Sequence, residues 1–250
     1  MKACAVTDTG RVRPVNQDFL YASTEPVGPL ANLFIVADGM GGHQAGDFAS
    51  RYLVGHLVKH IESSSLAAEQ PVPVLRQAIE DVNTELFELA CAKPDLAGMG
   101  STLVAATVAG GVLYVANVGD SRLYTIRGTG IRQITRDHSF VEEMVSRGQM
   151  ERGSRAYKEQ KNIITRAMGI GRKIRIDFFE EPLSGGEYLL LCSDGLTNMV
   201  DNSAIFRLVL MPETLQMKAK ALIALANQNG GRDNIAVILV DPQISEVRER

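Results

Sequence analysis

The sequence contains only three cysteines, Cys4, Cys91 and Cys192, which lie far apart along 250 residues. An odd and scattered set of thiols does not suit a disulfide framework or a structural zinc site, and it fits a reducing cytoplasm. The chain also lacks a run of about 18 apolar residues, which a membrane-spanning helix needs. Its N-terminus, MKACAVTDTGR, has too short an apolar stretch for a signal peptide. These absences predict a cytoplasmic protein without a membrane segment.

Positive charge is also in short supply. Lys and Arg number 26 against 29 Asp and Glu, which gives a formal net charge of −3 and an isoelectric point near 5.9. This balance argues against a general nucleic-acid-binding surface. With 45% hydrophobic and 22% charged residues, the composition is that of a globular protein with a sizeable core. No internal repeat, linker or shift in composition divides the chain, so a single domain is expected.

The sequence does contain a mixture of helix and strand patterns. Apolar stripes and flanking signals predict helices at about residues 45–63, in the stretch that ends near 92, and at 139–148, 202–210 and 213–229. Strand-like runs occur at residues 3–7, 19–23, 33–37, 101–109, 112–118, 121–126, 131–135, 176–180, 187–192 and 234–240. Short connections such as Gly110-Gly111 can join only antiparallel neighbours. We therefore predict an α+β domain with two mainly antiparallel sheets, covered on their outer faces by antiparallel helix pairs.

Five aspartates each lie beside one of these apolar runs: Asp18, Asp38, Asp120, Asp194 and Asp233. Two of them, in LFIVADG and LLLCSDG, end a strand and are followed at once by glycine. Several carboxylates near a core are costly unless a cation neutralises them. Oxygen ligands without a Cys/His cluster select Mg²⁺ or Mn²⁺ rather than Zn²⁺. The pattern predicts a shared divalent-metal site, in which Gly39 after Asp38 allows a sharp turn and presents a backbone carbonyl to a second ion.

Other motifs carry less chemistry. GMGGHQAG lies between a strand and a helix, but it matches neither the dinucleotide-binding pattern nor a nucleotide P-loop. His56 and His60 are four residues apart on a predicted helix, yet residue 57 is not the glutamate of a metalloprotease. They are expected to be solvated helix residues. Cys192 lies inside an apolar strand and is expected to have a small, buried structural role.

Eight motifs together resemble the metal-dependent protein phosphatase family of the protein phosphatase 2C type, and in particular its compact single-domain bacterial branch. They are TDTGRVRPVNQD, FIVADGMGGHQAG, GSTLVAA, ANVGDSRLY, ITRDHS, NIITRAMG, LLLCSDGL and GGRDNIAVILV. Their order and spacing match the family from residue 5 to about 240. The resemblance implies a four-layer α-β-β-α sandwich, which agrees with the pattern of predicted elements.

The resemblance also implies a set of metal ligands for two core ions, Mn²⁺ or Mg²⁺. Asp38 would bridge the two ions, and Gly39 would give its carbonyl oxygen to one of them. Asp194 and Asp233 would hold the other ion. Asp18 would complete the site directly or through water.

Two further positions follow from the same resemblance. Arg13 takes the place of the family's phosphate-binding arginine, whose planar fork can hold two phosphate oxygens at once. Asp120 matches an aspartate that helps Asp194 to hold a third, weaker ion. The catalytic set that the resemblance implies is Arg13, Asp18 and Asp38.

The sequence departs from the family pattern at two places. Gln17 stands where many relatives have glutamate, so the second ion would have one negative charge fewer around it. Met40 stands where some relatives have a histidine that acts as general acid. His43, His138 and a metal-bound water are the remaining candidates for that proton donor. His138 is also expected beside a helix cap at Ser139.

The function that these residues imply is hydrolysis of phosphoserine and phosphothreonine in proteins, by direct attack of a metal-bridging water or hydroxide. Phosphorylated proteins and a partner Ser/Thr kinase are the expected partners, and the protein is expected to be a monomer. One alternative is a catalytically silent, phosphoprotein-binding regulatory module on the same fold. A two-metal nuclease would need a basic groove, which the acidic charge disfavours.

The expected domain spans residues 1–241, and residues 242–250 are predicted to be a frayed tail. Residues 149–175 are polar, and we predict an irregular segment there. The resemblance implies a flap beside the metal site at about 147–175. This flap holds nine basic residues against two acidic ones in an otherwise acidic chain, so we expect it to attract phosphorylated segments.

Overall fold

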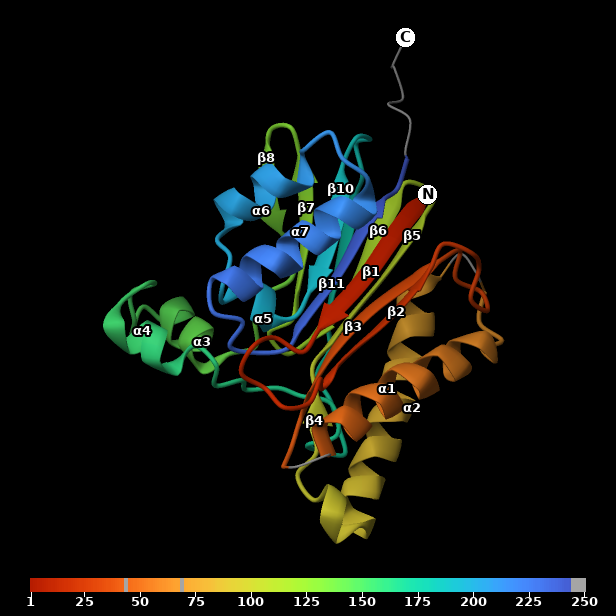
Figure 1. Cartoon of the computed structure of the whole chain (residues 1–250). Coiled ribbons are helices and arrows are strands. Elements are labelled where there is room, and N and C mark those ends of the chain that lie inside the picture. The colour runs from red at the N-terminus through yellow and green to blue at the C-terminus, as the bar shows by residue number, and fades with distance from the viewer. Residues whose placement is uncertain (43–44, 68–69, 244–250) are drawn as a thin grey trace.

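Two β-sheets lie face to face, with helices on both outer sides (Figure 1). The structure is a computed structural model that describes residues 1–42, 45–67 and 70–243. The first sheet has the strand order β1 (Lys2–Asp8), β11 (Ile235–Asp241), β10 (Tyr188–Cys192), β7 (Arg122–Arg127) and β8 (Gly130–Gln133). The second has the order β2 (Asp18–Ser23), β3 (Leu33–Met40), β5 (Leu103–Ala109), β6 (Val112–Val118) and β9 (Asp177–Pro182), with β4 (Gly100–Ser101) paired to β3. Every strand pair is antiparallel, as predicted.

The alternation of side chains along the strands creates the layers. In β3, Leu33 and Ile35 belong to the cluster beneath α1 (Ala45–Glu62) and α2 (Pro71–Ala92). Phe34 and Val36, on the other face of the same strand, pack between the two sheets. Strand β11 divides in the same way between the inter-sheet core and the helices of the other side. The predicted α-β-β-α sandwich is confirmed.

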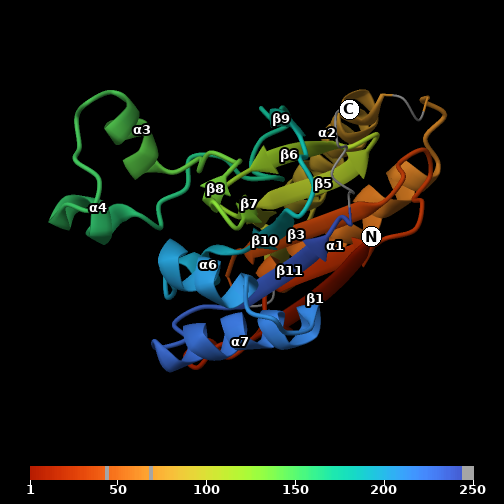
Figure 2. The ribbon, with the colours of Figure 1, turned by 90° about the horizontal axis from the view of Figure 1, so that it is seen from above.

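The helices on the second outer face are α5 (Asp194–Thr197), α6 (Asn202–Val209) and α7 (Leu215–Gln228). Figure 2 shows α6 and α7 on the side of the sandwich opposite α1 and α2. Among the described residues, no helix is long and apolar enough to cross a membrane.

Helices α1 and α2 are joined by a polar clamp that the sequence did not predict. The His56 Nδ1 and His60 Nε2 atoms of α1 lie 2.8 and 2.7 Å from the two carboxylate oxygens of Glu85 in α2. The Tyr52 hydroxyl donates a third hydrogen bond of 3.0 Å to Glu85. The two histidines are therefore interhelical contacts rather than solvated side chains.

Two short helices lie between β8 and β9, and the second of them, α4, falls in the segment that was predicted to be irregular. Helix α3 (Phe140–Ser146) begins at the expected cap, because the Ser139 hydroxyl accepts a hydrogen bond from the Glu142 amide. Helix α4 (Arg155–Gln160) follows within the predicted flap. Figures 1 and 2 both show α3 and α4 projecting from the side of the sandwich. A single-turn 3₁₀ helix (Pro94–Leu96) was also not predicted. The frayed tail predicted over 242–250 falls mostly on residues 244–250, outside the described residues.

The chain that leaves the flap is anchored to α2 by one buried side chain. Asn83 donates hydrogen bonds to the carbonyls of Gly171 and Arg172, at 2.9 and 3.2 Å. Its side-chain oxygen accepts from the Gly169 amide at 2.9 Å. The side chain thereby holds the segment between the flap and β9 against the helix layer.

Replacing Asn83 should destabilise the fold, because the carbonyls of Gly171 and Arg172 and the buried amide of Gly169 would lose their hydrogen-bond partner. We expect Asn83→Ala to lower the free energy of unfolding by about 2–3 kcal/mol. Urea unfolding followed by circular dichroism measures this change. Thr84→Ala, at the neighbouring position, serves as the control and should change the value by less than about 0.5 kcal/mol. Equal effects of the two substitutions would contradict the anchoring role.

Candidate metal centre

Four of the five predicted aspartates meet where strand ends of the two sheets come together. Asp18 is the first residue of β2 and lies directly opposite Asp38 of β3 in the strand register. Asp194 follows β10 after one residue, and Asp233 precedes β11 by two. Ser193 joins the sheets, because its hydroxyl donates a hydrogen bond of 2.6 Å to Asp18 Oδ2.

Glycine follows two of these aspartates for a reason that differs from the predicted one. Strand β3 continues through Gly39 to Met40 and pairs with β4, so no sharp turn occurs there. A side chain at Gly39 would instead collide with the carbonyl oxygen of Gly46, at the start of α1. At Gly195, a side chain would collide with the carbonyl oxygen of Asn234. Close approach of a second segment, rather than a turn, excludes every larger residue at both positions.

The backbone around Asp38 is held on several sides. The Asp38 amide donates to the Thr102 hydroxyl at 3.0 Å, and the Asp38 carbonyl accepts from the Thr102 amide at 2.8 Å. The Ser101 hydroxyl donates to the same carbonyl at 3.1 Å. Gly39 donates its amide to the carbonyl of Gln17 at 3.0 Å. These bonds fix the direction of the Asp38 side chain before any ligand binds.

The carboxylates share a strongly perturbed electrostatic environment. Burial, together with the charges of Asp194 and Asp233 and against a hydrogen bond from Ser193, raises the pKa of Asp18 to about 7. Burial, followed by the charge of Asp18, raises the pKa of Asp38 well above its usual range. Burial and the Asp233 charge raise the pKa of Asp194 to about 6. Like charges facing each other across a strand pair are destabilising, so this arrangement favours a bound cation.

The donor set fits a hard divalent cation. Four buried side-chain oxygen or nitrogen atoms in the described residues have no hydrogen-bond partner, and two of them are Asp18 Oδ1 and Asp194 Oδ1. Unpaired carboxylate oxygens and backbone carbonyls are the ligands that Mg²⁺ and Mn²⁺ prefer. Within the described ranges, no three His, Cys, Asp or Glu side chains already converge on one ion position.

Arg13 lies at the edge of this carboxylate group. Its Nη2 atom lies 2.8 Å from Asp233 Oδ2, and about half of the side chain is exposed. The hydrogen bond and the charge of Asp233 raise the pKa of Arg13, and Asp38 and Asp194 contribute in the same direction. A guanidinium held beside the carboxylates and open to solvent is placed to meet an anionic ligand.

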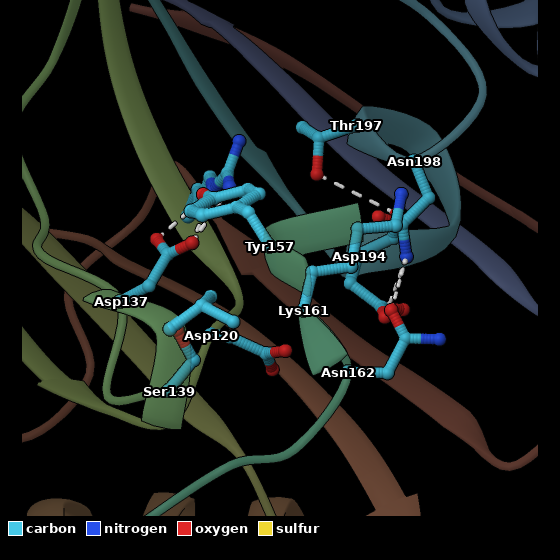
Figure 3. A pocket seen from close by; sticks show the side chains of 11 residues that line it. Asp120, Asp137, Ser139, Tyr157, Lys161, Asn162, Asp194, Thr197 and Asn198 are labelled. Carbon is cyan, nitrogen blue, oxygen red and sulfur yellow. Dashed lines mark hydrogen bonds and ion pairs between the residues drawn. The ribbon is translucent and has the colours of Figure 1, made fainter. Parts of the chain in front are cut away.

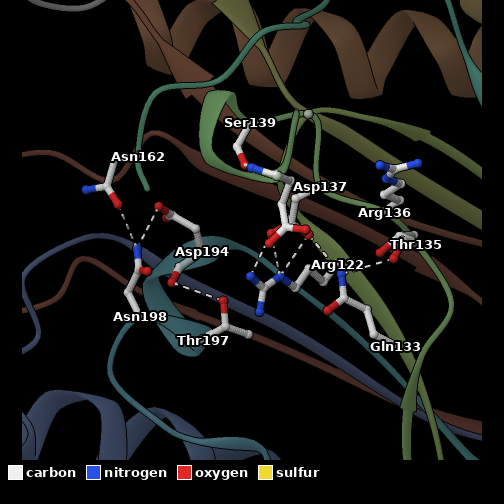
Figure 4. Close-up of polar contacts among 12 residues, drawn as sticks. Arg122, Gln133, Thr135, Arg136, Asp137, Ser139, Asn162, Asp194, Thr197 and Asn198 are labelled. Atoms are coloured by element: carbon white, nitrogen blue, oxygen red, sulfur yellow. Dashed lines mark hydrogen bonds and ion pairs between the residues drawn. The ribbon is translucent and has the colours of Figure 1, made fainter. Parts of the chain in front are cut away.

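A cavity of about 160 Å³ separates the flap from the sandwich. Asp120 and Asp194 line it from the sandwich, and Tyr157 and Lys161 line it from the flap (Figure 3). Burial raises the pKa of Asp120 to about 8, and the Asp194 charge adds to this effect. The position suits the third-ion role that the resemblance implied. Figure 4 shows Asn198, which donates a hydrogen bond of 2.9 Å to Asp194 Oδ2 in this region.

The wall of the same cavity contains a rigid ion pair. Arg122 contacts both carboxylate oxygens of Asp137 through Nε, at 2.9 and 3.0 Å, and through Nη2 at 2.6 Å (Figure 4). Gln133 donates a further hydrogen bond of 2.8 Å to Asp137. Asp137 thus neutralises the charge of Arg122, and the ion pair supports the wall of the cavity.

His138 does not have the geometry of a general acid. It is only 4% exposed, and its Nδ1 accepts a hydrogen bond of 3.1 Å from the Gly119 amide. Its Nε2 lies 3.2 Å from Asp177 Oδ2 and 3.2 Å from Arg166 Nη1. Burial lowers the pKa of His138, which favours the neutral ring. The residue instead holds the turn before Asp120. The other histidine candidate, His43, lies outside the described residues.

Several polar residues at the site were not identified from the sequence as functional. Ser193 and Asn198 contact the aspartates directly. Asn234 accepts a hydrogen bond of 2.9 Å from the Gln17 amide, and its side chain donates to the carbonyls of Thr9 and Val15. Ser193 and Asn234 are immediate neighbours of predicted ligands, and this adjacency was the available signal.

Comparison with known proteins agrees with this geometry. The protein phosphatase 2C family profile matches residues 11–228. The serine/threonine phosphatase stp of Listeria monocytogenes serovar 1/2a is 41% identical over 246 residues, which cover 96% of this chain and 95% of the relative. The crystal structure of a bacterial serine phosphatase has a TM-score of 0.90 at 36% identity, covering 99% of this chain and 100% of that chain. The catalytic domain of the serine/threonine phosphatase PstP, solved with two manganese ions, has a TM-score of 0.83 at 33% identity, covering 96% of this chain and 97% of that chain.

A four-layer sandwich with buried, oxygen-only donors at its strand ends is the architecture of a metal-dependent phosphatase. Within that class, the chain belongs to the protein phosphatase 2C family, because the family profile and the relatives cover nearly its whole length. It is a protein serine/threonine phosphatase.

The raised pKa values predict an unusual pH dependence for the metal-free protein. A carboxyl with a folded pKa of about 6–8 binds a proton that the unfolded chain, with a pKa near 3.9, has already released. Stability in the presence of chelator should therefore fall as pH rises from about 5 to 8. Asp18→Asn removes one of these titrations, so this variant should be more stable than wild type at pH 8 by about 2–4 kcal/mol.

Urea unfolding at pH 5, 6.5 and 8 in chelator measures this difference. The advantage of Asp18→Asn should be smallest at pH 5, where the wild-type carboxyl is protonated. Glu80→Gln, at an exposed position in α2, is the control and should run parallel to wild type. A constant difference between Asp18→Asn and wild type at all three pH values would contradict a raised pKa for Asp18.

Proposed function

We propose that this phosphatase hydrolyses phosphoserine and phosphothreonine at a centre formed by Asp18, Asp38, the Gly39 carbonyl, Asp194 and Asp233. The observation that carries the proposal is the convergence of these buried carboxylates, two of which keep an unpartnered oxygen. Their mutual repulsion and their all-oxygen chemistry favour two core ions, Mn²⁺ or Mg²⁺. The family is metal-dependent, and the PstP catalytic domain was solved with two manganese ions.

Each of these residues has a proposed part in holding the ions. Asp38, whose side chain is fixed by the surrounding backbone bonds, would serve both core ions. Asp194 and Asp233 would hold one of them, and the Gly39 carbonyl would contribute to the other. Asp18 would complete the centre directly or through water. When bound, the ions would supply a water of lowered pKa as the nucleophile and positive charge for the phosphoryl oxygens.

The remaining residues act on the substrate and on the edge of the centre. Arg13 would bind two phosphate oxygens through its guanidinium and orient the ester for attack. Asp120, with Asp194, would hold a third and weaker ion in the cavity beneath the flap. His138 is buried with both ring nitrogens engaged, which leaves His43 or a metal-bound water to protonate the leaving serine or threonine oxygen.

The biological setting that we propose follows from this chemistry. A phosphatase for serine and threonine phosphates reverses the action of a Ser/Thr kinase, so the proposed partners are phosphorylated proteins and such a kinase. The small number of scattered cysteines supports a reducing cytoplasm as the compartment. We propose that the enzyme acts as a monomer and as one domain over residues 1–241, with the flap at about 147–175. A silent regulatory module is disfavoured because all the expected ligands are present.

Removing the shared ligand should abolish catalysis without unfolding the protein. Asp38→Ala deletes the carboxylate that would serve both ions and also relieves repulsion among its neighbours, so we expect at least a 1,000-fold loss of kcat, on the order of 4 kcal/mol. Turnover of p-nitrophenyl phosphate and a phosphothreonine peptide with Mn²⁺ measures this loss, and excess EDTA should abolish wild-type activity. Asp81→Ala is the control. If calorimetry still detects two tight ions in Asp38→Ala, the assignment of Asp38 is wrong.

Arg13 should contribute mainly to substrate binding. Its removal takes away contacts that the ground state and the transition state share, so Arg13→Ala should raise KM for p-nitrophenyl phosphate about tenfold and leave kcat nearly unchanged. Steady-state kinetics at saturating Mn²⁺ separates the two constants. The exposed Arg207→Ala in α6 is the matched control. A collapsed kcat with unchanged KM would instead assign Arg13 to the transition state.

A further inference from the structure

A second cavity, of about 190 Å³, lies on the Arg13 side of the metal centre. Three basic side chains from separate parts of the chain line it: Arg13, Lys161 at the end of α4, and Arg232 just before β11. Gly195 and Asp233 complete the wall toward the metal centre. We refer to this space as the Lys161–Arg232 cavity. One proposed ligand, Asp233, lines the cavity directly, and Gly195 is the neighbour in sequence of another, Asp194.

The positive charge in this cavity is only partly compensated. Asp233 neutralises Arg13 at 2.8 Å. Lys161 and Arg232 form no ion pair within 4 Å with any carboxylate of the described residues, although the chain carries a net charge of −3. Five of the nine basic residues of the flap region, in contrast, have a carboxylate partner. What sets Lys161 and Arg232 apart from other basic residues without a carboxylate partner is that they line one cavity together, beside Asp233.

Lys161 and Arg232 also repel each other. Burial lowers the pKa of the Lys161 ammonium, the charges of Arg122 and Arg232 lower it further, and Asp194 opposes them. Like charges that face one space are relieved when an anion enters it. Lys161 also lines the cavity beneath the flap, so this residue borders both cavities.

We propose that the Lys161–Arg232 cavity is a substrate subsite for a second anionic group, on the same polypeptide segment as the phosphorylated serine or threonine. The scissile phosphate meets Arg13 and the metal centre, and the second group binds between Lys161 and Arg232. A glutamate or aspartate carboxylate and a second phosphate share the required chemistry. The substrate class is thus an acidic or multiply phosphorylated segment. This inference rests on the proposed function and adds the recognition of sequence around the scissile phosphate.

The subsite can be tested with a series of short phosphothreonine peptides. One glutamate is moved from position −3 to +3 around the phosphothreonine in an otherwise neutral peptide, and each member is compared with its glutamine counterpart. Parallel peptides carry a second phosphothreonine at the best glutamate position. We expect kcat/KM to rise about two- to fivefold for glutamate at one or two positions, as is usual for partly exposed ion pairs, and at least as much for phosphate.

Variants of the enzyme connect this preference to the cavity. Arg232→Gln should lose most of the preference for the acidic peptide while retaining turnover of p-nitrophenyl phosphate, and Lys161→Gln should lose the same preference. Arg232→Glu should reverse the preference in favour of a lysine-containing peptide. Lys158→Gln is the matched control, because it removes the same charge from the same helix at a residue that does not line the cavity. It should keep the wild-type preference.

The possible outcomes separate this inference from the proposed function. If wild type hydrolyses neither p-nitrophenyl phosphate nor the neutral phosphopeptide, the proposed function fails. If it hydrolyses glutamate and glutamine peptides equally at every position, the subsite is wrong and the proposed function stands. An equal loss of preference in Lys158→Gln would show a diffuse effect of flap charge and would also overturn the subsite. A preference for the second phosphate alone would identify phosphate, rather than carboxylate, as the occupant.

Discussion

Repulsion among buried carboxylates is the constraint on which the rest of this structure depends. Asp18 and Asp38 lie opposite each other across a strand pair, with Asp194 and Asp233 close enough to perturb them. Such a group is unfavourable unless protons or cations compensate it. The surrounding scaffold is accordingly rigid, and it places Ser193, Thr102 and backbone amides where they hold the carboxylates together. This cost in stability is what a centre for divalent ions, as in the metal-dependent family, would require.

The same electrostatics explain the surroundings of the centre. Basic side chains that lie near it belong to two groups with different roles. Arg122 is fully engaged by Asp137 and stabilises a wall, whereas Arg13, Lys161 and Arg232 face open space beside the aspartates. A protein with net negative charge therefore presents a local positive entrance to its negative centre.

Much of the fold followed from the sequence because its signals are local. Alternating apolar residues predicted β3 and β11, and Gly110-Gly111 adopts the positive φ angles of a tight hairpin turn. The flap helix α4 was missed because its residues are polar and carry no apolar stripe. The sharp turn predicted at Gly39 is absent, because β3 continues through it. The carbonyls that exclude a side chain at Gly39 and Gly195 come from other segments, and no local pattern shows such an approach.

The pairing of β1 with β11 has a consequence for synthesis of the protein. These strands come from opposite ends of the described chain, yet they align over their full length, from Lys2 opposite Asp241 to Asp8 opposite Ile235. Asp233 and the segment that supports Gly195 immediately precede β11. A nascent polypeptide on the ribosome thus lacks part of its centre until this last strand has emerged and docked. Catalytic competence should therefore depend on the docking of β11 against β1, and a product that ends before Asp233 would lack part of the proposed centre.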